Sequence, residues 1–497
     1  MEEHNERVKN IAARVRYFHE HGEHFRMYHG STSTTRKVKL SRSSVVDTSG
    51  MRHVLRIDTE RQVAIVEPNV SMEQLVDATL LHSLLPPVVM EFPAITVGGG
   101  FAGTAGESSS FRHGLFDKII TRIEIVLANG NVVEASHDER ADLLDAAAGS
   151  FGTLGVITLL EVKLIRASSY VKLNFTHVNG MEAAVQTIEK YTALSEIDYI
   201  EGIMFKVDSG LVITGTLTDE VETKLPVSRY TRRQDPWFYL RAQAIHDKEM
   251  DDVQELVPIK DYLFRYDRGS FWAGMYAFKY FVIPFNSITR RILDPLLRTD
   301  VAYHALHKSR LSDEYIVQDI GFPYATVGQF VEYLHWTLGF YPLWLCPFKM
   351  ERDMSLRPRN MPAFDPGARS PGMMLNVGLW GPGSRRYDEW LTLNRDIERK
   401  TAELGGLKCF YAQAFYTPDE FWSLYDKRWY DEVRAKYFAT GLMPVNEKIN
   451  VDFSNRIPPH LQPWRDWLYE KFKEQWPVRG VYGALHALTN REYLLGK

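Results

Sequence analysis

A run of glycine and hydroxyl residues over positions 95–114, ITVGGGFAGTAGESSSFRHG, has the composition of a binding loop. Because glycine lacks a Cβ, a backbone this rich in it can adopt left-handed conformations and approach a ligand closely. The free N–H groups and hydroxyls suit phosphate and carbonyl oxygens. The run lacks the repetitive composition of a flexible linker, so we interpret it as a cradle for a cofactor. The candidate contacts are Thr96, Val97, Gly98, Gly99, Gly103, Thr104, Glu107, Ser108 and Ser109.

Part of this cradle, Gly98 to Gly103, matches the dinucleotide-binding pattern G-x-G-x-x-G. That pattern is informative only where it opens a helix inside a parallel β-α-β unit. The residues that follow, 104–111, are small, polar and interrupted by glycine, so they form a helix poorly. No parallel strand pattern surrounds the run. The sequence therefore disfavours a Rossmann fold.

Two further segments have the composition of ligand-binding turns. An expected strand over 25–28 runs into His29, Gly30 and five hydroxyl residues, which suits a pyrophosphate loop. An expected short helix over 142–148 ends in a second glycine-rich turn, GSFGTLG at 149–155, before an apolar strand. The candidate contacts here are Gly30, Ser31, Thr32, Ser33, Thr34, Gly149, Gly152, Thr153, Gly155, Val156 and Ile157.

Composition limits the class of protein. A chain of 497 residues allows two domains or one large composite, and 59 basic against 63 acidic residues give no electrostatic support for nucleic-acid binding. The two cysteines, Cys346 and Cys409, exclude a disulfide framework and a zinc site built from cysteines. The densest histidine group, His19 to His24, spans a helix end and a turn, so no metal site is predicted.

No signal peptide or membrane-spanning helix is expected. Residues 1–16 are charged throughout, and no window reaches about 18 uninterrupted apolar residues. The longest apolar segment, 271–285, is broken by Lys279 and ends near Pro284. Burial is the favoured interpretation of this segment, with a face that dips into a membrane as the alternative.

Local patterns predict several elements of an α+β fold. Apolar residues at helical spacing predict an amphipathic helix over 3–20, and Ser71 with Gln74 forms a capping box that opens another. Asn129-Gly130 predicts a type I′ hairpin. A strand is expected over 410–415.

Several motifs together resemble a known family. The motifs VEPNV (66–70), TVGG (96–99) and GSFGTLGVI (149–157) resemble the FAD-binding domain of the vanillyl-alcohol oxidase (PCMH-type) superfamily. The segments that resemble the Δ24-sterol reductase (24-dehydrocholesterol reductase) family are 103–110, 113–116, 170–173, 214–220, 270–272, 341–348 and 420–422. The resemblance covers roughly residues 5–450, and the tail beyond is atypical of the family.

The resemblance implies how the chain is organised. It implies a PCMH-type FAD-binding domain of two α+β lobes and a central α+β cap that selects substrate. Residues 1–166 would form the FAD-binding domain and residues 167–415 the cap. Residues 416–497 would return to the FAD domain and end in the atypical tail.

The resemblance also implies a reaction, the reduction of an isolated C=C bond in a sterol or sterol-like terpenoid, dependent on FAD and driven by NADPH. A side-chain acid would protonate C24 and hydride from flavin N5 would add at C25, which requires a dry pocket and aromatic faces. Tyr411 is the candidate acid and Glu107 the second candidate. Arg434 and Lys448 are candidate contacts to flavin or pyrophosphate, with solvated helix charges as the alternative. The candidate substrate pocket is Trp272, Phe278, Trp344 and Phe348, which could equally be ordinary core.

The attachment of FAD and its place in the cell are further expectations. Some oxidases of the superfamily tether flavin to a histidine in the cradle; Gly106 occupies that position here, so non-covalent FAD is predicted. Animal and plant members carry an N-terminal membrane anchor, and this chain begins where that anchor would end. We expect a cytoplasmic protein, peripheral on the cytosolic face of the endoplasmic reticulum.

Two alternatives to the reductase remain open. One is a soluble FAD oxidase, dehydrogenase or ene-reductase of a different hydrophobic secondary metabolite, with O2 as a possible acceptor. The other is a flavin-free binding protein with the same fold. Both glycine-rich segments are intact, which argues against the flavin-free alternative.

Overall fold

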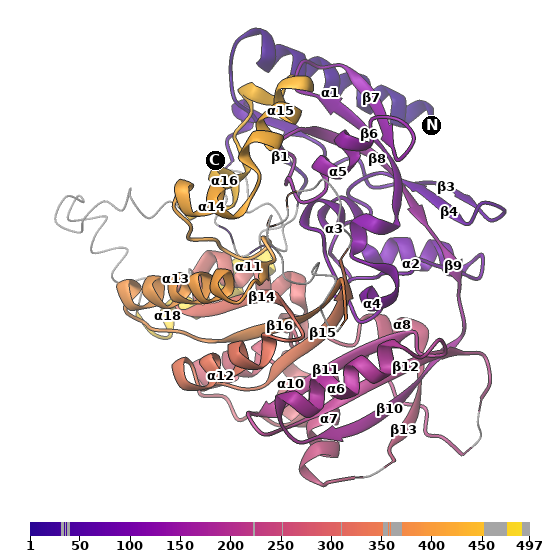
Figure 1. The fold of residues 1–497 in the computed structure, drawn as a ribbon, viewed down its shortest axis with the longest axis vertical. Coiled ribbons are helices and arrows are strands. Elements are labelled where there is room, and N and C mark those ends of the chain that lie inside the picture. The colour runs from indigo at the N-terminus through magenta and orange to yellow at the C-terminus, as the bar shows by residue number, and fades with distance from the viewer. Residues whose placement is uncertain are drawn as a thin grey trace.

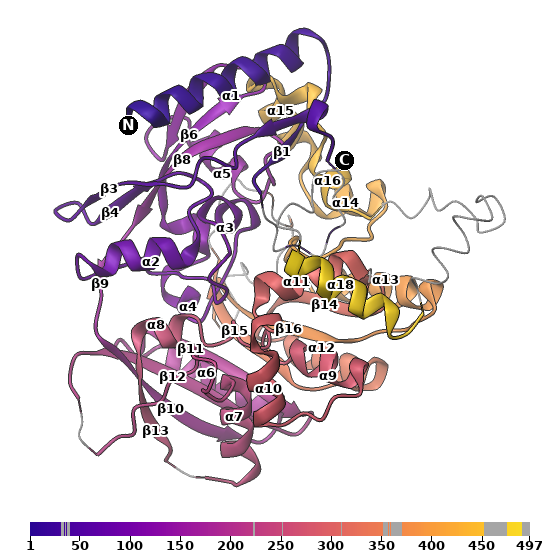
Figure 2. The same ribbon diagram turned by 180° about the vertical axis from the view of Figure 1, so that it is seen from behind.

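The computed structural model describes residues 1–30, 34, 36, 40–221, 224–250, 252–309, 311–350, 356, 358, 370–451 and 475–489. These residues form an α+β fold around two main sheets, one of five strands and one of eight (Figures 1 and 2). The α+β class expected from the sequence is confirmed. Both sheets are antiparallel, so the described residues contain no parallel β-α-β unit around the glycine run.

The five-stranded sheet forms the centre of the N-terminal lobe. Its strands in spatial order are β3 (Val54–Asp58), β4 (Val63–Val66), β8 (Gly155–Lys163), β6 (Ile120–Leu127) and β7 (Val132–Ser136). The apolar stripe of α1 (Glu2–Glu20) packs on one face, against Val126 and Val156. Because successive side chains point to opposite faces, Ile125 faces the other side, where α2 (Met72–Leu80) and α3 (Val97–Gly103) pack.

Short elements complete this lobe, and a late segment of the chain returns to it. The short elements are β1 (Arg26–Tyr28), β2 (Val45–Asp47), β5 (Leu84–Leu85), β9 (Ile165–Arg166), α4 (Ser110–His113) and α5 (Ala141–Ala147). The returning helices are α14 (Pro418–Leu424), α15 (Lys427–Lys436) and α16 (Val445–Ile449). α15 lies beside α5, where Lys436 Nζ is 2.6 Å from Asp142 Oδ2 (Figure 1).

The eight-stranded sheet forms the second lobe. Its strands in spatial order are β13 (Gln254–Pro258), β10 (Tyr170–Val178), β12 (Ser209–Thr218), β11 (Tyr199–Lys206), β15 (Leu343–Lys349), β16 (Met373–Pro382), β14 (Tyr315–Pro323) and β17 (Leu407–Lys408). One face packs against α6 (Gly180–Thr192), α12 (Val327–Thr337) and α13 (Tyr387–Glu403). The opposite face packs against α7 (Phe238–Asp247), α8 (Ile259–Leu263) and the N-terminal lobe.

A group of helices lies at the edge of this opposite face. The group is α9 (Ala273–Phe281), α10 (Ser287–Leu293), α11 (Thr299–Ser309) and α18 (Val478–Thr489). α11 and α18 lie side by side (Figure 2). A Cβ built on Gly483 would lie 2.6 Å from the carbonyl oxygen of Ala305, so glycine permits this close approach. Among the described residues, no helix combines the length and apolar character needed to cross a bilayer.

The two sheets use separate parts of the chain, residues 54–163 and 170–408. The division into domains at 1–166, 167–415 and 416–497 therefore stands as a proposal that this separation supports.

Some local predictions are confirmed and others are wrong. The capping box of Ser71 and Gln74 opens α2, and Asn129-Gly130 joins β6 to β7. The turn there is not type I′, because Gly130 has a positive φ of 83° and Asn129 does not. The predicted strand over 410–415 is wrong, since its first residues form a turn after β17. Thr96 caps a short helix, α3, inside the glycine run itself.

A buried histidine joins α1 to the five-stranded sheet. His4 Nδ1 lies 3.0 Å from Glu67 Oε1, and His4 Nε2 lies 3.2 Å from Glu124 Oε1. Hydrogen bonds to Glu124 and Glu67 raise the pKa of His4 to about 9. Burial alone would raise the pKa of Glu67, but hydrogen bonds from His4 and His53 outweigh it and lower that pKa to about 2. The imidazolium is thus held between two carboxylates.

We expect His4→Gln to lower the unfolding free energy of the N-terminal lobe by about 2–4 kcal/mol, because it removes a buried charge partner. The raised pKa of His4 makes its contribution complete below about 6.5 and lost as pH rises through about 9. The lowered pKa of Glu67 makes its contribution complete above about 4.5. Thermal melts of both proteins from pH 5 to 9 should converge at the alkaline end. Lys9→Gln, in an exposed pair on the same helix, is the control and should change nothing.

Candidate active site

A cavity of about 820 Å³ lies between the two lobes. Its walls come from the glycine-rich segments of the N-terminal lobe, from β14, β15 and β16 of the eight-stranded sheet, and from α9, α11 and α18. Segments from the beginning, middle and end of the chain therefore line one cavity.

The first wall is bare glycine backbone. Thr96 Oγ1 accepts a hydrogen bond from the N–H of Gly99 at 3.1 Å and so starts α3. A Cβ on Gly98 would lie 2.8 Å from the Cβ of Pro68, so glycine is needed for α3 to sit against the end of β4. Gly98, Gly99 and Gly103 all line the cavity. No Cβ separates this backbone from a ligand.

The second glycine turn continues this wall. Gly149 and Gly152 have φ values of 74° and 75°, in the region that favours glycine, and both line the cavity. Thr153 points away from it, with its hydroxyl oxygen 2.7 Å from the Tyr430 hydroxyl of α15. The returning C-terminal segment thereby holds the turn in place.

One end of the cavity is basic. Arg26, His29, Arg36 and Lys448 line it, and within the described part of the chain no carboxylate pairs with the two arginines or the lysine. Burial and then the charge of Arg26 lower the pKa of Arg36 to about 10, and its Nη1 is buried without a hydrogen-bond partner. Burial and then Arg36 and Arg26 lower the pKa of Lys448 to about 7. The positive charge at this end is therefore not balanced by a described carboxylate.

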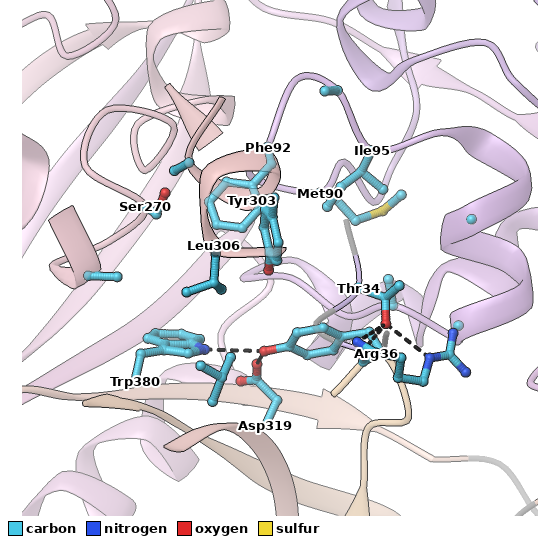
Figure 3. A pocket seen from close by; sticks show the side chains of 18 of the residues that line it. Thr34, Arg36, Met90, Phe92, Ile95, Ser270, Tyr303, Leu306, Asp319 and Trp380 are labelled. Carbon is cyan, nitrogen blue, oxygen red and sulfur yellow. Dashed lines mark hydrogen bonds between the residues drawn. The ribbon is translucent and has the colours of Figure 1, made fainter. Parts of the chain in front are cut away.

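The other side of the cavity carries a hydrogen-bonded acid pair (Figure 3). Tyr411 Oη lies 2.5 Å from Asp319 Oδ2, and Trp380 Nε1 donates to the same phenol oxygen at 3.2 Å. Asn376 Nδ2 donates to Asp319 Oδ1 at 2.7 Å. Burial raises the pKa of Asp319 to about 7 although both hydrogen bonds oppose it, and burial also raises the pKa of Tyr411. Both groups are thus substantially protonated near neutral pH.

Thr34 connects the basic end to the acid pair. Its hydroxyl donates to the backbone carbonyl of Tyr411, and Arg36 Nε donates to Thr34 Oγ1 at 3.0 Å (Figure 3). Thr34 therefore helps to position the turn that carries Tyr411.

A second carboxyl, that of the partly exposed Glu91, lines the cavity. Glu91 has no hydrogen-bond partner among the described side chains, and burial followed by the charge of Glu107 raises its pKa to about 8. It is therefore a largely neutral carboxyl at pH 7.

The remaining lining is apolar. Phe278, Trp344 and Phe348 line the cavity as predicted for a hydrophobic substrate. Trp272 lies behind it, fully buried, and its indole N–H donates to the backbone oxygen of Trp380 at 3.0 Å. Trp272 thus supports the wall without lining it.

The structure separates the predicted site residues into groups. The described candidates that line the cavity are Thr34, Thr96, Gly98, Gly99, Gly103, Thr104, Gly149, Gly152, Gly155, Ile157, Phe278, Trp344, Phe348, Tyr411 and Lys448. The candidates that lie outside the lining are Gly30, Val97, Glu107, Ser108, Ser109, Thr153, Val156, Trp272 and Arg434. Ser31, Thr32 and Ser33 fall outside the described residues.

Two of the candidates outside the lining have clear structural roles. Glu107 pairs with the buried Arg265, whose Nη2 lies 3.3 Å from Glu107 Oε1. Arg434 donates to the backbone oxygens of Ala439 and Leu442 and so holds the turn before α16. Both side chains are committed to protein partners, which argues against direct roles in catalysis or cofactor binding.

Asp319, Arg36 and Glu91 were missed by the sequence analysis. Arg36 directly follows the predicted hydroxyl loop, and Asp319 is a lone acid in the apolar strand IVQDIGF. A lone charge inside a strand that is mostly apolar is the signal that could have identified Asp319.

Comparison with known proteins defines the class. Residues 5–136 match a family model described as an FAD binding domain, and this stretch contains α1, the five-stranded sheet up to β7 and the glycine cradle. The cradle and basic end therefore belong to an FAD-dependent oxidoreductase.

The relatives identify the family. The chain is 30% identical to a Delta(24)-sterol reductase of Arabidopsis thaliana over 437 residues, covering 81% of this chain and 76% of that protein. It is 29% identical to the Delta(24)-sterol reductase of Macaca fascicularis over 460 residues, covering 90% and 86%. A Delta(24)-sterol reductase homolog of Caenorhabditis elegans is 25% identical, covering 90% and 87%. The chain belongs to the Delta(24)-sterol reductase family.

The cavity residues fit FAD. The orphaned Nη1 of Arg36 and the unpaired Lys448 supply positive charge for a pyrophosphate, and the glycine backbone supplies N–H donors and close approach. An anion at this end would also restore the ordinary pKa of Lys448, because burial and neighbouring positive charge now depress it.

We expect Arg36→Ala to weaken FAD binding roughly 10–100-fold, since a charge-assisted hydrogen bond contributes about 1.5–3 kcal/mol. Titration of apoprotein with FAD, followed by flavin fluorescence, gives the dissociation constant. Arg52→Ala, an exposed arginine of the same lobe, is the control. Equal affinity of Arg36→Ala and wild type would remove Arg36 from the cofactor site.

Proposed function

We propose that this protein reduces an isolated C=C bond in the side chain of a sterol or sterol-like terpenoid, with electrons from NADPH. The observation that carries the proposal is the hydrogen-bonded Tyr411–Asp319 pair, which faces an apolar cavity shared with the glycine cradle. The names of the relatives agree with it, since each is a Delta(24)-sterol reductase or its homolog.

An isolated alkene has no carbonyl to polarise, so its reduction begins most readily with a strong proton donor in a dry site. While Asp319 is protonated, its O–H can donate to the phenol oxygen of Tyr411, which also accepts from Trp380. The phenol proton is then free to point into the cavity. Tyr411 gives that proton to an alkene carbon and takes one from Asp319, so no buried phenolate accumulates.

The protonated alkene carries positive charge that the cavity must stabilise. The indoles of Trp344 and Trp380 line the cavity, with ring centroids 6.1 Å apart. Aromatic faces attract cations, and the apolar lining excludes water that would otherwise capture the carbocation. FAD, when bound, supplies the hydride that completes the reduction.

We also propose that FAD is held without a covalent bond. Gly106 lines the cavity and offers no nucleophile, and a Cβ there would lie 2.8 Å from Leu115. His29 is the histidine that lines the cavity among the described residues, and its contacts lie at the basic end.

The proposed function is tested by anaerobic absorption spectroscopy of the purified protein. Flavin bands that bleach with NADPH and return on addition of desmosterol support both the donor and the substrate. Bleaching that is reversed only by O2, with peroxide formed, would favour the oxidase alternative. Flavin that stays with acid-precipitated protein would contradict non-covalent binding, and colourless protein that takes up no FAD would contradict the function.

We expect Tyr411→Phe to lower the turnover number about 10²–10⁴-fold, the usual contribution of a general acid, while the flavin spectrum is retained. Single-turnover oxidation of the reduced enzyme by the sterol isolates this step. Tyr324→Phe is the matched control, because Tyr324 is buried with an unpartnered hydroxyl outside the cavity lining. Wild-type turnover in Tyr411→Phe would exclude Tyr411 as the donor.

We expect sterol reduction to be fast below pH 7 and to slow as pH rises above it. The raised pKa of Asp319, about 7, means that its carboxyl loses its proton there, and the ionised form draws the Tyr411 proton away from substrate. Asp319→Asn should be slow and should lose this pH step. A pH–rate profile of the single-turnover rate that is flat from pH 6 to 9 in wild type would contradict the relay.

A further inference from the structure

Four exposed apolar side chains form a patch beside the cavity, which we call the α9–α10 patch. Val282, Ile288, Ile292 and Trp476 are 75, 69, 62 and 58% exposed. Trp476 belongs with the others because its indole N–H donates to the backbone oxygen of Tyr280 at 2.5 Å, near the end of α9. Large apolar patches on a protein surface generally mark a binding face.

Two of the four patch residues, Ile288 and Ile292, lie on the short helix α10. α10 has no buried residue, and the Asn286 side chain caps it by accepting from the N–H groups of Ile288 and Thr289. Leu293 packs against the core and Arg290 lies over the Phe285 ring, so one side of α10 contacts protein while Ile288 and Ile292 face solvent. α10 and α18 both lie toward the viewer in Figure 2.

The backbone conformation of Val282 is a further observation that points to a functional surface. It adopts a left-handed conformation with φ of 55° at the C-cap of α9, a position that favours glycine. For a β-branched residue such a conformation is strained, and strain of this kind clusters at functional sites. The strained turn directs an apolar side chain into solvent.

The patch is continuous with the cavity lining. Ile283 and Leu293, the neighbours of Val282 and Ile292 in the chain, both line the cavity. Val481 and Leu485 of α18 line it too and are 43 and 56% exposed, so the cavity reaches the surface there. Gly480 fits α18 against α9, since a Cβ on it would lie 2.5 Å from the Tyr280 ring. The cavity mouth is thus surrounded by apolar surface.

Basic residues outnumber acidic ones in the segment that carries Val282, Ile288 and Ile292. Residues 273–300 contain Lys279, Arg290, Arg291 and Arg298 against two acids, Asp294 and Asp300. Asp294 is buried and paired with Arg268. The Arg233 side chain adds a further positive charge, with its Nε 2.5 Å from the backbone oxygen of Arg291. Arg298 is paired with Asp267 and Asp300, whereas no described carboxylate pairs with Arg291. Exposed apolar side chains with arginine and lysine nearby are typical of surfaces that lie in the headgroup region of a bilayer.

We propose that the α9–α10 patch docks on a bilayer containing anionic phospholipid, with the cavity mouth toward the lipid. Val282, Ile288, Ile292 and Trp476 would enter the headgroup region, and the surrounding arginines would attract the lipid phosphates. A hydrophobic substrate could then pass from the bilayer into the cavity without crossing water. The identity of that substrate rests on the proposed function, whereas the docking surface does not.

Flotation of the FAD-loaded full chain with vesicles tests the proposal. We expect binding to vesicles of phosphatidylcholine with phosphatidylserine, weaker binding to phosphatidylcholine alone, and a loss with added salt. The double variant Ile288→Asp with Ile292→Asp should weaken vesicle binding roughly 10–100-fold. Arg291→Glu should weaken binding roughly tenfold, and only to the vesicles that contain phosphatidylserine. Leu81→Asp, an 85% exposed leucine at the end of α2, is the matched control and should bind as wild type.

A second readout locates the surface. Brominated lipids should quench the tryptophan fluorescence of wild type more than that of Trp476→Phe, while Trp336→Phe, at a 79% exposed tryptophan on α12, should behave as wild type. Wild-type protein that ignores all vesicles, or an Ile288/Ile292 double variant that binds them normally, would overturn the proposal. A wild-type dimer that the double variant dissociates, with no vesicle binding, would instead make the patch an interface between two copies.

Measurements of sterol turnover distinguish the docking proposal from the proposed function. The Ile288/Ile292 double variant should reduce sterol supplied in cyclodextrin at the wild-type rate and sterol supplied in vesicles at least severalfold more slowly. If neither protein reduces sterol but vesicle binding follows the pattern above, the docking surface stands and the proposed function fails.

Discussion

The buried guanidinium of Arg265 connects the two lobes. Arg265 is 1% exposed and lies between Glu107 of the glycine cradle and Glu201 of the eight-stranded sheet, with Nε 2.9 Å from Glu201 Oε1. Tyr266 and Trp344 also donate to Glu201, at 2.8 and 2.9 Å. A buried charge is tolerated only when its partners are all in place, and removal of one partner of such a pair typically costs about 3–5 kcal/mol. The relative position of the cradle and the substrate wall, and hence the shape of the cavity, depends on this cluster.

Burial shifts the pKa values of the groups at the two ends of that cavity in opposite directions. It disfavours the charged form of every group, so it lowers the pKa of Lys448 and raises the pKa of Asp319, both to about 7. At the basic end, an anionic ligand would raise the pKa of Lys448 again, because its negative charge favours the protonated amine. At the acid end no cation among the described residues pairs with Asp319, so its carboxyl keeps a proton that it can pass to Tyr411. One cavity can therefore hold a pyrophosphate at one end and a neutral acid at the other.

The parts of the fold that were predictable depend on short-range geometry. Ser71 and Gln74 are three residues apart, and their reciprocal hydrogen bonds open α2 as expected. Asn129-Gly130 makes a hairpin because the turn lies between two apolar strands. The strand expected over 410–415 is wrong because its first residues form a turn, which the contacts of Tyr411 with Thr34 and Asp319 hold in place. Further along, Ala414 pairs with Asn450 in an isolated bridge and not in a strand. A propensity cannot register partners that distant in the chain.

The sequence by itself determined the class of protein, because glycine-rich turns and family motifs are local features that need no tertiary contacts to be recognised. It also placed Tyr411 and Lys448 among the candidates. The roles that we propose for Tyr411 and Glu107 depend on contacts that only the tertiary structure provides. Tyr411 is 92 residues from Asp319, and Glu107 is 158 residues from Arg265. Those contacts make the first pair a proton donor in the proposed reaction and the second a structural ion pair. The pKa and availability of a buried group depend on its spatial neighbours, which residue type and local spacing do not specify.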